Sequence, residues 1–136
     1  MTAATTDRNT KYRDGDSFAF PIAAATAIPA GVIVGLLGGF LVNAAADTDI
    51  TVVGMSTYPV DNTNGDDGAE KVPVTKKGLR RFFNSASADA ITTQDIGSPC
   101  YVVDNQTVAK TSATNTRPVA GTIQDVDADG VWISFK

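Results

Sequence analysis

Apolar and polar residues alternate most regularly near the C-terminal end of the chain. Val131, Ile133 and Phe135 are separated by less apolar or polar positions, and a similar alternation runs through residues 119–124. A two-residue period is typical of a strand with one buried face. Between the two runs, "DADG" contains turn-forming residues, and Gly130 tolerates a positive φ without steric cost. The pattern predicts a β-hairpin that ends near residue 135.

A long uncharged segment covers the thirty residues from Ser17 to Ala46. It is long enough to span a membrane, which makes a membrane-inserted helix through residues 17–46 the alternative to a globular fold. Pro21 and Pro29 interrupt a helix, and Gly38-Gly39 separates two short aliphatic runs. These features favour two strands joined by a tight glycine turn.

Other short apolar runs, bounded by turn residues, predict strands at residues 49–56, 71–83, 99–104 and 107–112. No segment has a helical period, and residues 88–97 fit either one helical turn or an extended loop. About eight short strands at this spacing indicate an all-β fold, a small barrel or sandwich. A chain of 136 residues is long enough for one such core.

The first fourteen residues differ from the rest. They are polar, rich in Thr and Ala, and lack a hydrophobic period. Such a segment has too little apolar surface to offset the entropy of ordering. We expect a flexible N-terminal arm over residues 1–14, followed by an all-β domain over residues 15–136.

The residue types exclude most familiar catalytic sites. The chain has no His, and its single cysteine is Cys100. Catalytic Ser-His-Asp and Cys-His groups, Cys/His metal sites and a disulfide within the chain are therefore excluded. Cys100 lies in a strand-like run, where a small buried residue is expected. We predict that the protein is not an enzyme and uses no cofactor.

Charge is distributed unevenly along the chain. The net charge is −4, which argues against a protein that coats nucleic acid. Six acidic residues and no basic residue lie between Asp47 and Glu70, and a basic cluster follows: Lys71, Lys76, Lys77, Arg80 and Arg81. We call these five residues the basic island. Either it is a solvated edge, close to acids such as those at 61–70, or it docks on an acidic partner.

The D-x-D-x-D-G sequence at Asp125, Asp127 and Asp129 resembles the start of a calcium-binding loop, but the residue at the closing position of the loop does not fit. The twelfth position of a helical calcium loop is a bidentate Glu, and here it is Lys136. The flanking strand patterns also replace the helices that such a loop needs. We therefore expect an acidic hairpin tip without a metal, and Trp132 either at a contact or in the core.

Four stretches taken in order resemble one family: "IPAGVIVGLLGGFLVNAAADTDITVVGMS", "VPVTKKGLRRFFN", "DAITTQDIGSPCYVVDNQTVAKT" and "RPVAGTIQDVDADGVWISF". They are similar to the small capsid decoration, or cement, proteins of tailed bacteriophages, a family formerly filed as a domain of unknown function. The resemblance spans residues 15 to 136. The long arm and the "TKKGLRR" stretch depart from the family pattern.

The resemblance implies an all-β protein on the outer surface of the virion capsid. Its partners would be the major capsid protein and further copies of itself, with a trimer favoured over a dimer. It implies no catalytic residue, no nucleic acid and no membrane. Candidate partner-binding residues are the basic island, four residues of the arm and the single tryptophan: Lys71, Lys76, Lys77, Arg80, Arg81, Arg8, Lys11, Tyr12, Arg13 and Trp132.

Two rival functions remain. A small membrane-inserted phage protein would need residues 17–46 to be helical. A carbohydrate-binding β-sandwich would use the acidic tip and Trp132, but one Trp and three Tyr are few for a sugar-stacking surface. Part of the apolar surplus in residues 17–46 is expected to face a neighbouring subunit if the decoration function holds.

Overall fold

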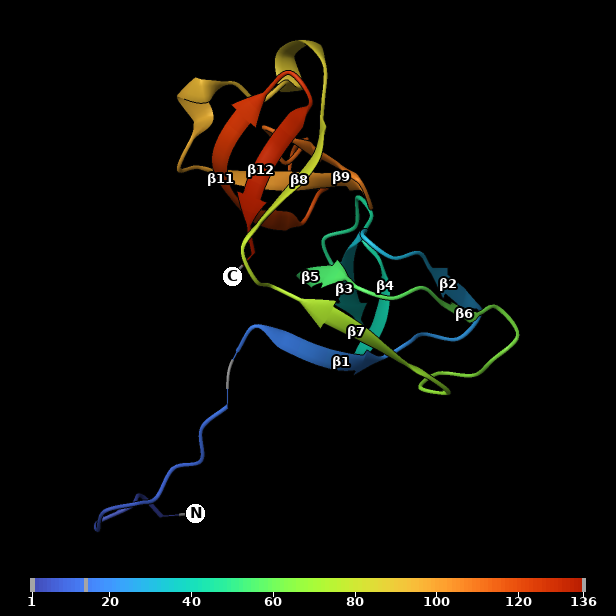
Figure 1. Ribbon diagram of the computed structural model, residues 1–136, viewed down its shortest axis with the longest axis vertical. Helices are drawn as coiled ribbons and strands as arrows, with labels where there is room; N and C mark the ends of the chain where they lie inside the picture. The colour runs from blue at the N-terminus through green and yellow to red at the C-terminus, as the bar shows by residue number, and fades with distance from the viewer. Residues whose placement is uncertain (1, 14, 136) are drawn as a thin grey trace.

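The computed structural model describes residues 2–13 and 15–135, and the fold is all-β (Figure 1). This confirms the predicted class, although the described residues form twelve strands rather than about eight. The strands are β1 (Ser17–Pro21), β2 (Thr26–Ile28), β3 (Ile33–Leu37), β4 (Phe40–Asn43), β5 (Thr51–Ser56), β6 (Val60–Asn62), β7 (Lys71–Thr75), β8 (Leu79–Asn84), β9 (Pro99–Asp104), β10 (Thr107–Ala109), β11 (Val119–Asp127) and β12 (Gly130–Ser134). Two short 3₁₀ turns, η1 (Ser87–Asp89) and η2 (Thr93–Asp95), give residues 88–97 their helical character.

The C-terminal half of the chain forms a closed barrel in the order β10-β8-β12-β11-β9. Closure depends on the parallel pairing of β8 with β10. The predicted terminal hairpin is confirmed, and Val131, Ile133 and Phe135 point into the core. A β-bulge in β11 changes the expected alternation at its start, so that Val119 is 51% exposed and Ala120 is buried.

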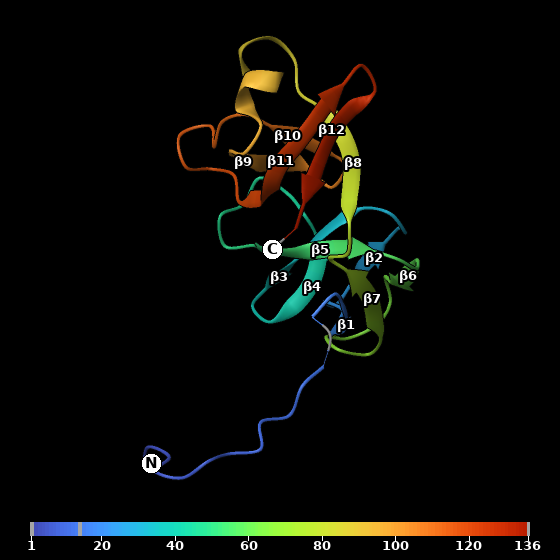
Figure 2. The same ribbon diagram turned by 60° about the vertical axis from the view of Figure 1, so that its left-hand side comes forward.

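The N-terminal half forms a five-stranded sheet in the order β1-β7-β5-β3-β4, with the small β2-β6 pair beside it. The sheet curls until its edge strands approach, and a single bridge joins Ile22 to Leu41. Its core is separate from that of the barrel and contains Ile22, Leu41, Val34 and Val72. Figures 1 and 2 show the barrel at one end, the sheet below it and the arm leading away from both.

Residues 17–46 form β1 to β4 and their turns, with Gly38 and Gly39 between β3 and β4 as predicted. No helix in the described residues is long and apolar enough to cross a membrane. Most of the buried apolar side chains of this segment belong to the core of the five-stranded sheet. Leu37, at 39%, is its only large apolar side chain exposed in the described residues, and the expectation that part of this segment faces a neighbouring subunit stays a prediction.

Residues 71–83 are not one strand, contrary to the prediction. The chain turns at Lys76, Lys77 and Gly78, and Gly78 has a φ of 71° that favours glycine. As a result β7 belongs to the sheet and β8 to the barrel. The prediction of a single core also needs correction, because two buried clusters meet at β3, where Ile33 packs into the barrel cluster and Val34 into the sheet cluster.

Candidate functional site

The basic island is divided among three places in the fold. Lys71 begins β7, Lys76 and Lys77 lie in the connection between sheet and barrel, and Arg80 and Arg81 belong to β8. Arg81 alone of the five makes an ion pair within the described part of the chain. The acids at 61–70 do not neutralise the island, because none of them is within ion-pair distance of it in the described residues.

Strand β8 separates its side chains into two sets. Phe82 is buried in the barrel core, and Arg80, on the same side, is half-buried, with no hydrogen-bond partner for its Nε among the described residues. Leu79, Arg81 and Phe83 share the other side and are exposed. Leu79 is 48% and Phe83 57% exposed, which is high for large apolar side chains. The outer set is the more exposed one, and it excludes Arg80.

Arg81 and Trp132 form a fixed unit on neighbouring strands. They are directly opposed in the β8-β12 ladder, and the guanidinium carbon of Arg81 lies 5.7 Å from the centre of the Trp132 ring. The indole Nε1 of Trp132 donates to Asp127 Oδ2 at 2.8 Å. Arg81 also lies 3.7 Å from a carboxylate oxygen of Asp129. Trp132 is therefore on the outside of the barrel, half-buried against its neighbours, and not in the core.

Asp127 explains the D-x-D-x-D-G sequence without a metal. Its Oδ1 accepts the backbone N–H of Asp129 at 2.8 Å and that of Gly130 at 3.1 Å, which closes the β11-β12 turn. The hydrogen bond from Trp132, followed by those from the backbone, lowers the pKa of the Asp127 carboxyl. No group of three or more acidic, His or Cys side chains within the described ranges is arranged to hold a metal ion.

We define the docking face as the outer side chains of β8 and their neighbour on β12: Leu79, Arg81, Phe83 and Trp132. It combines exposed aromatic and aliphatic groups with a guanidinium, the residue types enriched at the energetic centres of interfaces. A hollow of about 210 Å³ beside it is lined by Phe83, Arg81, Gly31 and Gln106, among others. The face belongs to the closed barrel, so its strands are held in register from both sides.

Two of the predicted partner-binding residues, Arg13 and Lys76, lie close together where the arm meets the sheet. The guanidinium of Arg13 lies 5.1 Å and the ammonium of Lys76 5.8 Å from the ring centre of Phe18, on β1. The backbone N–H of Lys76 donates to the carbonyl of Asp16 at 2.7 Å. One residue of the arm and one of the island are thus brought together on an aromatic ring.

The rest of the arm is outside these clusters. Arg8, Lys11 and Tyr12 are exposed, and residues 2–13 contain no helix or strand. In both views the arm runs away from the barrel (Figures 1 and 2). The structure therefore brings none of these three residues to the docking face, and it leaves the predicted flexibility of the arm untested.

Sequence reasoning missed Leu79, Phe83 and Phe18 as site residues. Leu79 and Phe83 had a readable signal, because in "LRRFF" they share a two-residue period with Arg81. Phe18 had none, since its contact with Lys76 joins positions 58 residues apart. The role of Asp127 was equally hidden by its resemblance to a metal ligand.

Comparisons of the chain with protein-family models, with curated proteins and with solved structures find no match.

Proposed function

We propose that this protein is a capsid decoration protein of a tailed bacteriophage, which binds the outer surface of the shell and holds major capsid protein subunits together. The observation that carries the proposal is the docking face, with two large apolar side chains exposed beside an ordered Arg81-Trp132 pair. Exposed apolar groups gathered on one rigid face indicate a protein contact. A structural role needs such a face and no catalytic centre.

The four stretches that carry the family resemblance support the same conclusion. They correspond to β3 through β5, to β7 with β8, to β9 with β10 and to β11 with β12. Each therefore coincides with strands and their connecting turns rather than with loops alone. The second and fourth stretches also contain every residue of the docking face.

Charges of both signs lie near the docking face, and the basic island supplies those that would meet an acidic partner surface. Asp127 and Asp129 are engaged within the hairpin, by Trp132 and Arg81 respectively. Lys77 is exposed in the connection that leads into β8 and makes no ion pair in the described residues. Such charges mainly set the orientation and rate of association, whereas the apolar groups supply most of the affinity.

Several weak contacts would act together on a capsid. One copy would bind neighbouring major capsid protein subunits and sister copies, as a trimer in preference to a dimer, so the combined affinity exceeds that of each contact. The arm would add a further contact and gain order when it binds. Neither rival is favoured: residues 17–46 form strands and their turns, and Arg81 lies over the Trp132 ring, where a stacked sugar would compete with it.

The test is rebinding to capsids that have been stripped of the protein. Phe83→Ser should lower the occupancy at a fixed protein concentration by about tenfold or more, as removal of a buried interface aromatic does. Ile96→Ser is the matched control, because Ile96 is 45% exposed and is not part of the docking face. Circular dichroism should show both variants to be folded.

Arg81→Glu should slow rebinding at low salt, and the defect should shrink as salt rises. If the unmodified protein does not copurify with capsids in near-stoichiometric amounts, the decoration function is wrong. Equal rebinding of the Phe83 and Ile96 variants would instead move the contact away from β8.

A further inference from the structure

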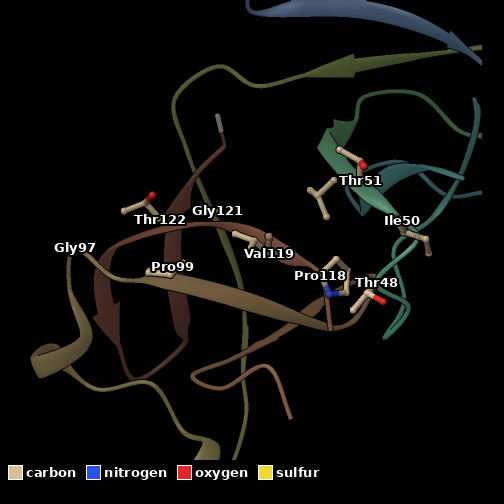
Figure 3. A pocket seen from close by; sticks show the side chains of 11 residues that line it. Thr48, Ile50, Thr51, Gly97, Pro99, Pro118, Val119, Gly121 and Thr122 are labelled. Carbon is tan, nitrogen blue, oxygen red and sulfur yellow. The ribbon is translucent and has the colours of Figure 1, made fainter. Parts of the chain in front are cut away.

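A groove separates the barrel from the five-stranded sheet (Figure 3). Its volume is about 500 Å³, within the range of sites that bind small ligands or peptide segments. One wall contains Ile50, Thr51 and Val52, and the other contains Pro118, Val119 and Thr122. Figure 3 shows Thr51 and Val119 on opposite walls. Among the described residues no charged side chain lines the groove, so the chemistry of these lining residues is apolar and hydroxylic.

Both walls contain strand segments with a neighbour on one side only. Thr51 and Val52 pair with β3, whereas β7 begins to pair with β5 only further along, beyond Gly54. On the opposite wall Val119 pairs with β9, and in the described residues β12 pairs with β11 only from Thr122 onward. The open stretch is at Val119, because a Cβ added to Gly121 would lie 2.4 Å from the carbonyl oxygen of Ser134. A strand with one open side can accept an extended segment through its backbone groups.

The chain itself contains a segment of matching chemistry. Residues 2–6 read Thr-Ala-Ala-Thr-Thr, which are small, uncharged and exposed. The arm continues with one acid and two cations, Asp7, Arg8 and Lys11, and the wall of the groove has Asp47 and Asp49 on either side of the lining residue Thr48. The uncharged tip thus matches the uncharged groove, and the following cations match the acids beside it.

We propose that residues 2–6 of one copy lie in the groove of a second copy as an added strand, with Arg8 and Lys11 close to Asp47 and Asp49. The arm of twelve described residues spans at most about 40 Å when extended. It begins at β1, where Arg13 lies on Phe18, and leads away from its own barrel. A head-to-tail contact of this kind closes into a ring when the rotation permits. It requires no capsid and is therefore independent of the proposed function.

The proposal can be tested by disulfide trapping between full-length chains. Cys100 is buried and burial raises its pKa to about 12, so it does not compete for oxidation in the folded protein. A Thr5→Cys chain is mixed with a Val119→Cys chain under mild oxidation, and mixed dimers are measured by mass. The matched control replaces Val119→Cys by Leu37→Cys, because Leu37 is also apolar and exposed but lies outside the groove.

We expect the Val119 variant to give at least several times more mixed dimer than the Leu37 variant. Equal yields from the two partners would overturn the proposal. A chain carrying both Thr5→Cys and Val119→Cys should form disulfides between chains; closure within one chain at high dilution would show that the arm occupies its own groove and would equally overturn it.

A charge exchange tests the second half of the contact. Arg8→Glu in the donor chain should lower the mixed-dimer yield by about two- to fivefold at low salt, the effect expected of an exposed ion pair. Asp49→Lys in the acceptor should restore it. Asp49 is the better choice, because the Asp47 carboxylate accepts the backbone N–H of Asp49 and supports the loop. A yield unaffected by Arg8→Glu, or not restored by Asp49→Lys, would contradict the proposed pairing.

Discussion

The barrel and the five-stranded sheet differ in how completely they remove their strand edges. Parallel pairing of β8 with β10 closes the barrel, whereas one bridge between Ile22 and Leu41 joins the edges of the sheet. An unpaired edge invites association, and closure leaves the described barrel only a short open segment at the start of β11. The two regions therefore suit different contacts: the barrel presents side chains from a rigid face, and the sheet offers open strand segments and the arm.

Strand β3 connects these regions and limits their independence. Ile33 is buried in the barrel cluster and its neighbour Val34 in the sheet cluster, because adjacent strand residues point to opposite faces. Ala44, which follows β4, also belongs to the barrel cluster. The barrel core is thus completed by residues of the sheet, so we expect the two regions to unfold together.

The largest effect should come from matched core truncations, one in each region. Ile133 of the barrel and Ile22 of the sheet are both fully buried. Ile133→Ala and Ile22→Ala should each lower the free energy of unfolding by about 2–5 kcal/mol, through lost burial and the cavity that remains. Urea unfolding, followed by circular dichroism and by labelling of the Cys100 thiol, should show one transition in both variants.

The labelling readout decides whether the regions are coupled. Cys100 is buried in the barrel, so its thiol reacts only when the barrel opens. If Ile22→Ala melts the sheet while Cys100 remains protected, the regions unfold separately and β3 does not couple them. Leu37→Ala serves as the control, because this exposed side chain should change stability little.

The next largest effect is expected from substituting one glycine in each of two hairpins, the β3-β4 hairpin of the sheet and the β11-β12 hairpin of the barrel. Gly38, between β3 and β4, has a φ of 59°, and a Cβ added there would meet open space. Gly130 has a φ of 154°, and a Cβ there would lie 2.3 Å from the carbonyl oxygen of Phe82. Gly130→Ala should therefore cost about 1–3 kcal/mol from backbone strain, with an added cost from the clash.

Gly38→Asn should cost much less, since Asn tolerates the left-handed conformation. Thermal unfolding of the two variants measures the difference directly. A Gly130→Ala protein as stable as the Gly38→Asn protein would show that the barrel hairpin is more adaptable than its close contact with β8 indicates.

The same two hairpins show which parts of the fold can be predicted from the sequence. Both were predicted, because alternation and turn residues are local signals. The break at Gly78 was not, since the two-residue period continues on both sides of it and nothing local shows that β7 and β8 join different sheets. Phe18 was missed for a related reason: its contact with Lys76 exists only after β1 has paired with β7.

The smallest effect expected is a difference in how the stability of the two hairpins depends on pH. The barrel hairpin is closed by the Asp127 carboxylate, whereas the sheet hairpin depends on glycines. Hydrogen bonding lowers the pKa of Asp127 below the ordinary aspartate value of about 3.9. Because the folded pKa is depressed, the stabilisation is present above the unfolded pKa and is lost as pH falls through the folded value.

Trp132 is the only tryptophan and donates to Asp127, so its fluorescence should report this protonation with a midpoint below about pH 3.9. Asp127→Asn keeps a turn-closing oxygen but removes the acceptor of the indole N–H, and it should abolish that step. Asp61→Asn is the control: bonds from Thr63 also lower the pKa of Asp61, but it lies on β6, away from the barrel. If Asp61→Asn removes the Trp132 step and Asp127→Asn does not, the acid response belongs to Asp61 and not to the barrel hairpin.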